Sequence, residues 1–297
     1  MMAGVSAASS GARRLFSNLI VLIIVVLAGG FAAAALVRYS PGFDSIPEDM
    51  NLGMSPETLR ALHARHQRDN ALPVFYVRYL ARAVRGDFGD SEALKQPVAE
   101  LLRQRIPVTA KLIAWGTAGG WLFAGLLAWL AVWPRGRAVF RAGGSSVSGL
   151  LLAIPPAVLA LAFFFNEAPL TLALALALVP RLYGTLRVVL EDVYVSPSLL
   201  AARARGVGTM AIALRYVLSA AAPRLVALLG VGLVLAFGVA IPIEALCGVP
   251  GIGALALQAA TSRDMPLLCG LALAITFFVT LVHAAGELAV GERGETA

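Results

Sequence analysis

Long apolar runs alternate with short, charged segments along this chain. Six of the runs are long enough to cross a bilayer, which takes about 20 residues of helix. Because a backbone within lipid must satisfy its own hydrogen bonds, each run is predicted to be an α-helix. The pattern therefore predicts an all-α integral membrane protein with six transmembrane helices, at residues 15–37, 112–134, 142–166, 169–190, 225–243 and 265–286.

The first run also has features of a signal peptide, because Arg13 and Arg14 precede it and small residues follow at 32–35. Its apolar stretch is longer than the roughly 7–15 residues typical of a signal peptide, and five further runs follow it. We therefore interpret the first run as an uncleaved transmembrane helix.

The composition agrees with a membrane location. The 297 residues are 59% hydrophobic and 14% charged, whereas soluble domains carry about 25% charged residues. A net charge of +7 would suit nucleic acid, but the arginines have no aromatic interleaving and form no nucleic-acid motif. They flank the apolar runs instead. This position indicates a role in orientation and contact with membrane lipid, and no nucleic-acid partner is expected.

The basic residues also predict which ends of the helices face the cytoplasm, because positive charge in short loops marks that side. It occurs before the first run, at residues 135–141 and at 203–224, three places on one side of six alternating spans. Both termini are therefore predicted to be cytoplasmic. The arginine-rich segment 38–111 falls on the other side, but loops longer than about 60 residues escape this rule.

The long outer segment is predicted to fold into helices. An N-cap serine followed by proline starts one at 55–69, and apolar spacing predicts a second at 73–85, which Gly86 ends as a left-handed cap. A third helix is predicted at 97–105. These helices either lie on the membrane surface with arginines among the headgroups or form a docking surface for an outside partner. The sequence leaves both open.

No pattern in the chain is typical of catalysis. Neither lysine follows a glycine, so the phosphate-cradling loop of many ATPases is absent, and there is no zinc-protease or serine-hydrolase motif. His63, His66 and Asp69 lie along one predicted helix at a spacing that rarely closes a metal site. We expect no catalytic residue, no metal site and no cofactor of the chain's own.

Two further pairs of side chains receive a structural interpretation. His283 and Glu287, at the end of the last run, are interpreted as a solvated polar end in preference to a proton relay. Cys247 and Cys269 lack any metal-binding spacing. We interpret them as small apolar residues, with a disulfide between them as the alternative.

Arg181 lies well inside a predicted span. It follows the start of its run by about twelve residues, or about 18 Å of helix. An intramembrane arginine usually faces protein or water. Arg181 therefore either reaches the headgroups or contacts another helix, or it lines a translocation path, with Pro155, Pro156 and Pro180 as predicted kinks along that path.

Two loops carry the remaining patterns. In the last outer loop Glu244 is followed by residues 250–253, whose two glycines permit a tight re-entrant turn and close backbone approach. Asp264 and Pro266 then open the last helix. Between the fourth and fifth runs, residues 200–216 are predicted to form a short helix and turn of small residues and arginines, an element that a membrane protein keeps where a partner docks.

These patterns, taken in order, resemble the first membrane subunit of oligopeptide/dipeptide (and nickel) ABC importers. Residues 85–91 with 97–102 are similar to the family's Gly-Asp-Leu-Gly-x-Ser region and the helix after it. Ala202-Arg203-Ala204-Arg205-Gly206 is similar to its coupling-loop signature Ala-Arg-Ala-Lys-Gly. Glu244 with 250–253 resembles its Glu…Pro-Gly-(Leu/Ile)-Gly loop, and 263–266 its Arg-Asp-Tyr-Pro. The resemblance covers about residues 70–290.

The resemblance implies a type I ABC importer transmembrane domain in the bacterial inner membrane. It would consist of a cytoplasmic N-terminus with the first helix (1–37), a periplasmic helical segment (38–107), and a five-helix permease core (108–297) with a cytoplasmic coupling loop at 191–222. The implied partners are a homologous second permease, two cytoplasmic ATPase subunits that bind ATP and Mg²⁺, and an extracytoplasmic substrate-binding protein.

In this scheme a di- or oligopeptide passes from the binding protein to the cytoplasm. The implied site residues fall into three groups. The ATPase-coupling residues are Ala201, Ala202, Arg203, Ala204, Arg205, Gly206 and Arg215. The periplasmic gate residues are Glu244, Pro250, Gly251, Gly253 and Asp264. The candidate pathway residues are Arg181, Pro155 and Pro156.

Some features depart from the family pattern. Leu200 stands where the general importer loop motif has glutamate, Ser196-Pro197-Ser198 resembles an insertion, and the loop between the third and fourth runs is short. Two alternatives remain: a permease for nickel or another small solute, and an ion-coupled secondary transporter. A secondary transporter needs intramembrane carboxylates, and four of the six runs contain no charge.

Overall fold

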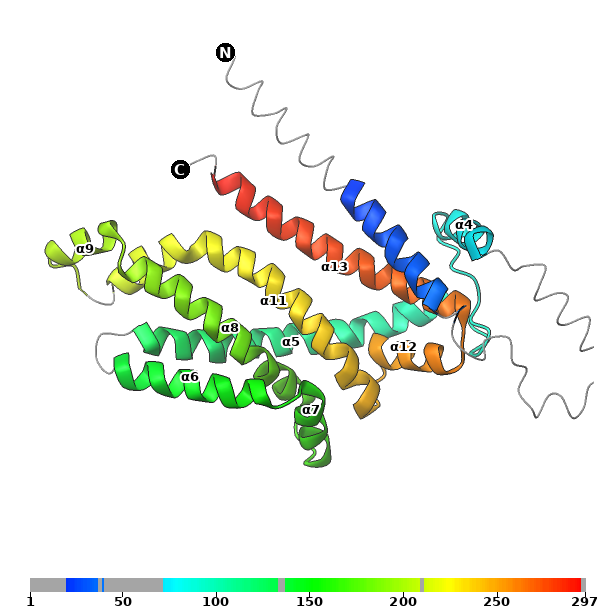
Figure 1. Ribbon diagram of the computed structural model, residues 1–297, viewed down its shortest axis with the longest axis horizontal. Helices are drawn as coiled ribbons and strands as arrows, with labels where there is room; N and C mark the ends of the chain where they lie inside the picture. Colours follow the sequence, from blue (N-terminus) through cyan, green and yellow to red (C-terminus); the bar gives the residue numbers. More distant parts are fainter. Residues whose placement is uncertain (1–19, 37–38, 40–71, 133–136, 209–210, 295–297) are drawn as a thin grey trace, which may run out of the picture. The chain divides into compact units, whose positions relative to one another are not determined.

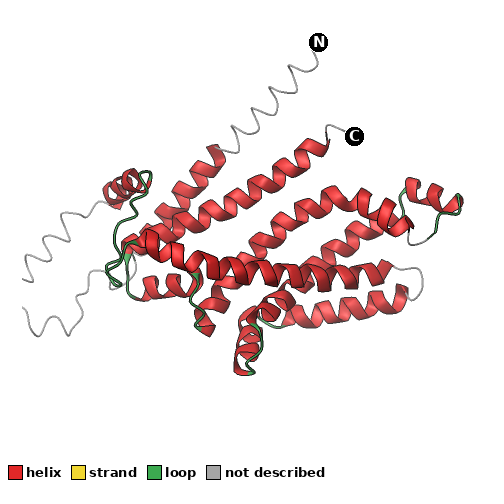
Figure 2. Cartoon of the chain, turned by 180° about the vertical axis from the view of Figure 1, so that it is seen from behind, coloured by secondary structure: helices red, strands yellow, loops and turns green. Residues whose placement is uncertain are grey.

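The computed structural model describes residues 20–36, 39, 72–132, 137–208 and 211–294. Within these residues all regular elements are helices. Asp90 and Pro97 form one isolated antiparallel β-bridge. Figures 1 and 2 show the helices as long rods joined by short connections. The predicted all-α fold class is confirmed.

Four helices are long and apolar enough to cross a membrane. They confirm the second, fourth, fifth and sixth predicted spans, and each helix is longer overall than its predicted span. The second also absorbs the predicted helix at 97–105, because Pro107 lies inside a continuous helix. Their bounds are α5 (Val98–Val132), α8 (Leu170–Tyr194), α11 (Leu218–Cys247) and α13 (Met265–Gly294).

The first and third predicted spans differ from these four. Residues 20–36 form an apolar helix, and 15–19 lie outside the described residues. The third span is not one kinked helix: α6 (Arg137–Ala153) and α7 (Pro156–Phe165) meet at 87°. Two consecutive prolines supply no N–H donors and disfavour a helical residue before them, so the helix stops instead of bending. Counting this pair as one span gives five.

The chain divides into two compact units. Residues 1–105 and 255–280 belong to the first unit, and 106–254 and 281–297 to the second. In the first unit α4 (Leu72–Ala83) confirms the predicted helix at 73–85, and Gly86 follows it with φ of 81°. The predicted helix at 55–69, with its histidines, lies outside the described residues.

Two tyrosines attach α4 to the apolar helices of the first unit. The Tyr76 hydroxyl donates a hydrogen bond to the carbonyl of Leu27 (2.6 Å), and that of Tyr79 to the carbonyl of Pro266 (3.2 Å). Their rings pack with Ala34, Cys269 and Leu273 in one buried cluster. The phenol suits this position because it offers a large apolar ring with one polar atom that needs a partner.

Asp264 ties the loop after α4 to the start of α13. Its buried carboxylate accepts hydrogen bonds from the Ser91 hydroxyl (2.5 Å), the Ala93 N–H (3.1 Å) and the Leu267 N–H (3.1 Å). The last bond caps the N-terminus of α13, where a carboxylate also faces the positive end of the helix dipole. Two of the motifs noted in the sequence, 85–91 and 263–266, are therefore parts of one polar junction.

The loop before Ser91 has a separate, exposed ion pair. Arg82 donates to Asp87 (2.8 Å), and the Gly89 N–H donates to the other carboxylate oxygen of Asp87 (2.9 Å). The hydrogen bond from Arg82, followed by that from Gly89, lowers the pKa of the Asp87 carboxyl below its ordinary value. This loop thus folds back on the end of α4.

In the second unit small residues bring the helices close together. An added methyl at Gly116 or Gly120 of α5 would press on Leu174 or Leu178 of α8, and one at Gly144 of α6 would press on the Tyr183 ring. Close approach through small residues is the usual way in which membrane helices pack. α8 therefore forms the centre of this unit, in contact with α6, α7 and α11.

We predict that Asp264→Ala lowers the free energy of unfolding by about 2–4 kcal/mol, because it removes a helix cap and leaves the buried Ser91 hydroxyl and the Ala93 N–H without this acceptor. Denaturant unfolding of the full-length protein in detergent measures this difference. Glu92→Ala, an exposed carboxylate in the same loop, is the control and should change little. Equal effects of the two substitutions would contradict the junction.

Candidate functional site

The connection between α8 and α11 contains the short helix α9 (Pro197–Ala204). Pro197 occupies the first turn, where its missing N–H costs nothing. At the other end the Gly206 N–H donates to the Arg203 carbonyl (2.9 Å) and the Val207 N–H to the Ala202 carbonyl (3.2 Å). This is the Schellman arrangement, and Gly206 adopts the left-handed conformation it needs, with φ of 75°.

Residues 200–216, predicted as a short helix and turn, contain the end of α9, a turn and a second helical element. The left-handed residue at 206 ends α9, and a separate π-helix, η1 (Ile212–Val217), leads into α11. Arg215 lies on η1 and is exposed. The tripeptide 196–198, which resembled an insertion, forms the start of α9.

One side of α9 packs against the protein and the other is free of it. Leu199 and Ala202 are buried, in a helix that contacts η1 and α8. Leu200 is 53% exposed. The other coupling candidates on or just after α9 are also exposed: Ala201, Arg203, Ala204, Arg205 and Gly206. Of the seven predicted coupling residues, only Ala202 is thus a packing residue.

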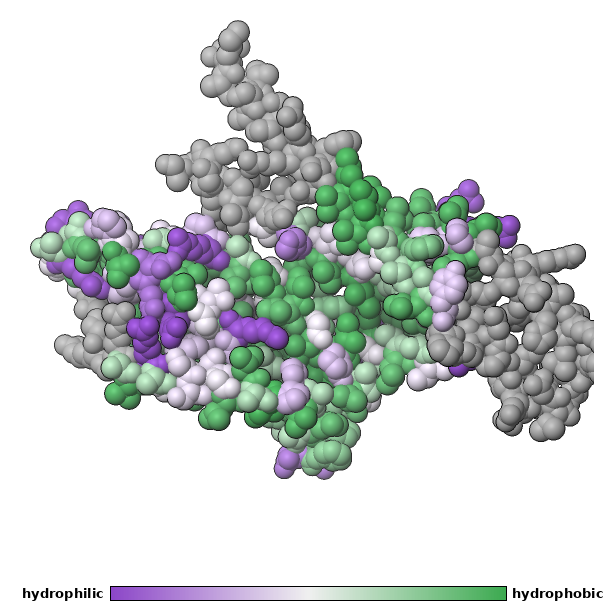
Figure 3. Space-filling model, viewed as in Figure 1, coloured by the Kyte–Doolittle hydropathy of each residue, from purple (hydrophilic) through white to green (hydrophobic). Residues whose placement is uncertain are grey.

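The exposed side of this segment is basic. Residues 195–217 contain no aspartate or glutamate. Asp192, just before them, is ion-paired with Arg224 at 3.1 Å. The Arg203 guanidinium lies over the Tyr194 ring (5.3 Å to its centroid), and Arg205 Nε donates to the Ala201 carbonyl (3.3 Å). Figure 3 shows hydrophilic residues gathered around α9 and the adjoining helix ends.

A second site in the same unit is the 244–253 turn, which consists of the last residues of α11 and the loop after it. Glu244 is fully buried. One of its carboxylate oxygens accepts the Gly253 N–H (2.7 Å), and the other has no hydrogen-bond partner among the described residues. The Ile252 N–H donates to the Thr109 hydroxyl of α5 (2.8 Å). Two consecutive backbone N–H groups of the turn, those of Ile252 and Gly253, are thus hydrogen-bonded to side chains of α5 and α11.

Two of the three glycines of this turn, Gly251 and Gly253, are required by close packing. A Cβ atom on Gly251 would collide with the carboxyl group of Glu244, and one on Gly253 would collide with the Ile241 carbonyl. The sequence predicted close backbone approach here, and the structure shows which groups approach. Pro250, between them and Glu244, is exposed.

Thr109 is a residue that sequence reasoning missed. It is a single hydroxyl in the first part of an apolar helix, two residues after Pro107, and is 1% exposed. A lone threonine in such a run has no distinctive spacing, and its partner Ile252 is 143 residues away. Only the fold brings them together.

The pathway candidates do not gather with either site. Pro155 and Pro156 form the corner between α6 and α7. Arg181 lies in the middle of α8 with its side chain exposed.

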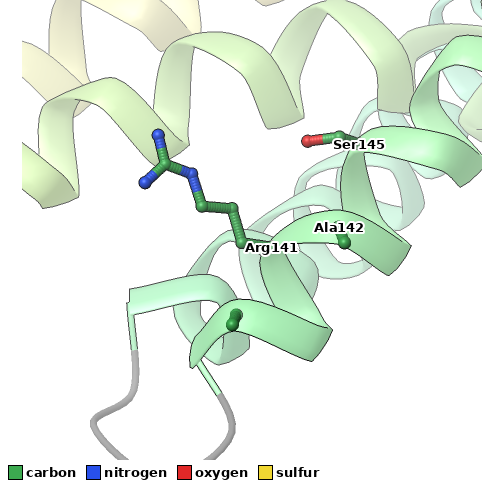
Figure 4. Close-up of a pocket in the computed structure, with 4 residues that line it drawn as sticks. Arg141, Ala142 and Ser145 are labelled. Atoms are coloured by element: carbon green, nitrogen blue, oxygen red, sulfur yellow. The ribbon is translucent and has the colours of Figure 1, made fainter.

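A polar cluster between α6 and α8 was also not predicted. Glu191 lies between the guanidinium groups of Arg141 (3.6 Å) and Arg187 (3.9 Å). Arg187 also donates to the Ser145 hydroxyl (3.2 Å). Figure 4 shows Arg141 extending from α6 beside an open hollow lined by Ala142 and Ser145. The Glu191 carboxylate bridges α6 and α8 and offsets one of the two positive charges, so the cluster joins the two helices and keeps a net charge of +1.

The remaining side chains that the sequence singled out are two cysteines and the pair His283 and Glu287. Cys247 and Cys269 are both buried and carry free thiols in the structure. His283 is exposed, in keeping with a polar helix end, and the side chain of Glu287 lies outside the described residues. Within the described part of the chain no group of histidine, cysteine and carboxylate side chains could hold a metal ion.

Apolar spanning helices, a basic connecting segment and a tightly packed turn define an integral membrane transport component. Residues 135–290 match the family described as the binding-protein-dependent transport system inner membrane component. The chain belongs to this family, and it is a permease of binding-protein-dependent ABC transport. This membership decides against the ion-coupled secondary transporter.

Relatives and solved structures agree with the family. A protein of Brucella ovis named as a peptide permease is 27% identical over 285 residues, with 80% of this chain and 84% of the relative covered. The oligopeptide transport system permease protein OppB of Escherichia coli K12 is 25% identical, with 81% and 84% covered. A chain of the inward-facing MetNI methionine ABC transporter has the same fold, with a TM-score of 0.58, 17% identity, and coverage of 65% of this chain and 95% of that one.

The packing at the 244–253 turn yields a second prediction. Gly253→Ala should destabilise the protein by about 1–3 kcal/mol, because its methyl group would press on backbone that cannot rotate away. Gly238→Ala, in α11 with open space around the added methyl, is the matched control and should be neutral or slightly stabilising. Thermal unfolding of both full-length variants compares them, and equal stability would contradict the close approach.

Proposed function

We propose that this permease carries di- or oligopeptides into the cell and that α9 with η1 is the element through which ATPase subunits drive it. The supporting observation for the second part is the exposed basic side of α9. Its buried side, Leu199 and Ala202, fixes the helix to the permease, and its exposed side leaves Leu200 and the arginines for a partner. An apolar centre with a charged rim is usual for protein interfaces.

In this proposal the partner surface is acidic. Arg203, Arg205 and Arg215 face outward in a segment that contains no carboxylate, so a negative groove would complement them and guide association. Two cytoplasmic ATPase subunits would supply that groove and bind ATP and Mg²⁺, and the permease itself would bind neither. A homologous second permease and an extracytoplasmic binding protein complete the assembly.

The cargo is proposed from the relatives. Proteins named as peptide or oligopeptide permeases align over about four-fifths of this chain. Nickel or another small solute is the second candidate, in keeping with the wider family that the sequence motifs resemble. Five residues are proposed to position the outer turns past which the cargo enters: Glu244, Pro250, Gly251, Gly253 and Asp264.

We predict that Arg205→Glu with Arg215→Glu, or Gly206→Asp alone, releases the ATPase subunits without unfolding the permease. Reversed charges would repel the acidic groove, and an aspartate at a left-handed position both strains the end of α9 and adds the wrong charge. Co-purification from cells that express the whole transporter measures the retained ATPase, which should fall by at least about tenfold.

The matched control for that experiment is Arg85→Glu, an exposed arginine outside this segment, which should retain ATPase at the wild-type ratio. If the coupling variants also retain it at that ratio, α9 is not the docking element. Loss of folded permease in the variants would be seen separately as a lower unfolding temperature.

The orientation is tested by cysteine labelling. Because both native thiols are buried, a new exposed cysteine should dominate the reaction with a membrane-impermeant maleimide. We predict that Lys95→Cys is labelled in spheroplasts and that Arg203→Cys is labelled only after the membrane is opened. The reverse labelling pattern would place α9 on the outer side of the membrane and would contradict the proposed coupling role.

A further inference from the structure

Arg181 has a position that the membrane makes costly. It is the twelfth of the 25 residues of α8, so about 16 Å of helix separate it from Leu170 and about 20 Å from Tyr194. Its side chain is exposed. Within the described residues its guanidinium has no hydrogen bond or ion pair, whereas Arg187, six residues further on, is bonded to Ser145 and lies beside Glu191.

Escape to the headgroups does not fit this geometry. Charged groups of α8 gather near its C-terminal end, where Arg187, Glu191 and Asp192 lie. Side chains on a helix point towards its N-terminus, which for α8 is away from that end. A guanidinium near the middle of a span must therefore face water, an anion or another protein.

The surroundings of Arg181 on α8 are small and polar. Thr185 is exposed one turn further on, and its hydroxyl donates to the Arg181 carbonyl (3.2 Å). A methyl group added to Gly184 would meet nothing within 4 Å. The opposite side of the helix buries Ala175, Val179 and Leu186. α8 therefore has one apolar side for packing and one open side with a fixed positive charge.

We propose that Arg181 is an anion-binding residue in the translocation path and that its ligand is the C-terminal carboxylate of the transported peptide. This inference rests on the proposed peptide cargo. A guanidinium matches a carboxylate in a two-bond, planar arrangement. The terminal carboxylate is the one anion that every unmodified peptide has, so a single arginine can recognise it in peptides of any sequence.

The experiment compares import of one peptide in two forms, with a free C-terminal carboxylate and with a C-terminal amide. The whole transporter, with its binding protein and ATPases, is reconstituted in liposomes with wild-type permease or with Arg181→Gln. The quantity measured is the ratio of initial import rates for the two forms. Because all proteoliposomes use the same binding protein, its own preference cancels when the ratios are compared.

We expect Arg181→Gln to lower the preference for the free carboxylate by about tenfold and to leave import of the amide nearly unchanged. Arg181→Lys should retain an intermediate preference, because it keeps the charge and loses the two-bond geometry. Arg187→Gln, the same change on the same helix at an arginine that already has partners, is the matched control and should leave the ratio at its wild-type value.

Three results would overturn the inference. An unchanged ratio with lost co-purification of the second permease would show that Arg181 pairs with a carboxylate of that subunit. An unchanged ratio with normal import and assembly would show that the guanidinium meets no ligand. If the wild-type transporter imports neither peptide form, the proposal of a peptide cargo is wrong. The wild-type measurement alone shows this, so it is distinguished from a failure of the Arg181 inference.

Discussion

A polar group inside an apolar medium must find its partner within the protein, and this constraint shapes the whole chain. It makes each apolar run a helix, because a single membrane-spanning segment can pair all its backbone N–H and C=O groups internally only as a helix. It also explains the side-chain hydrogen bonds that join distant segments. The Tyr76 and Tyr79 hydroxyls and the Asp264 carboxylate each bond a group on another element. The stability of these junctions derives less from the bond itself than from the cost of leaving it unmade.

The same constraint separates structural charges from functional ones. Asp264 and Asp192 have partners, and the Glu191 carboxylate lies between two arginines. The outward arginines of α9 and η1 have no acidic neighbour in their segment. Arg181 has no partner among the described residues, in the middle of a span. We propose that a partner completes the charges of α9 and η1 and that a ligand completes the charge of Arg181.

Much of this architecture followed from the sequence by simple rules. Four of the six predicted spans are long apolar helices in the structure, and Gly86 marked the end of α4 because a left-handed residue ends a helix. The corner at Pro155 and Pro156 was underestimated as a kink, since two missing donors in succession end a helix that one would only bend. The short helix and turn predicted at 200–216 left the helix bounds open, and the structure gives them as Pro197–Ala204, followed by a separate π-helix at Ile212–Val217.

What the sequence by itself determined is the local chemistry: which runs are helical, where basic residues gather, that no nucleotide-binding loop is present, and which family the chain belongs to. Only the tertiary structure decided the pairings. Ser91 meets Asp264 across 173 residues and Thr109 meets Ile252 across 143, and no spacing in a single sequence encodes such distances. It also decided which side of α8 is buried, and hence that Arg181 is left open, because burial depends on neighbouring helices and not on the residue itself.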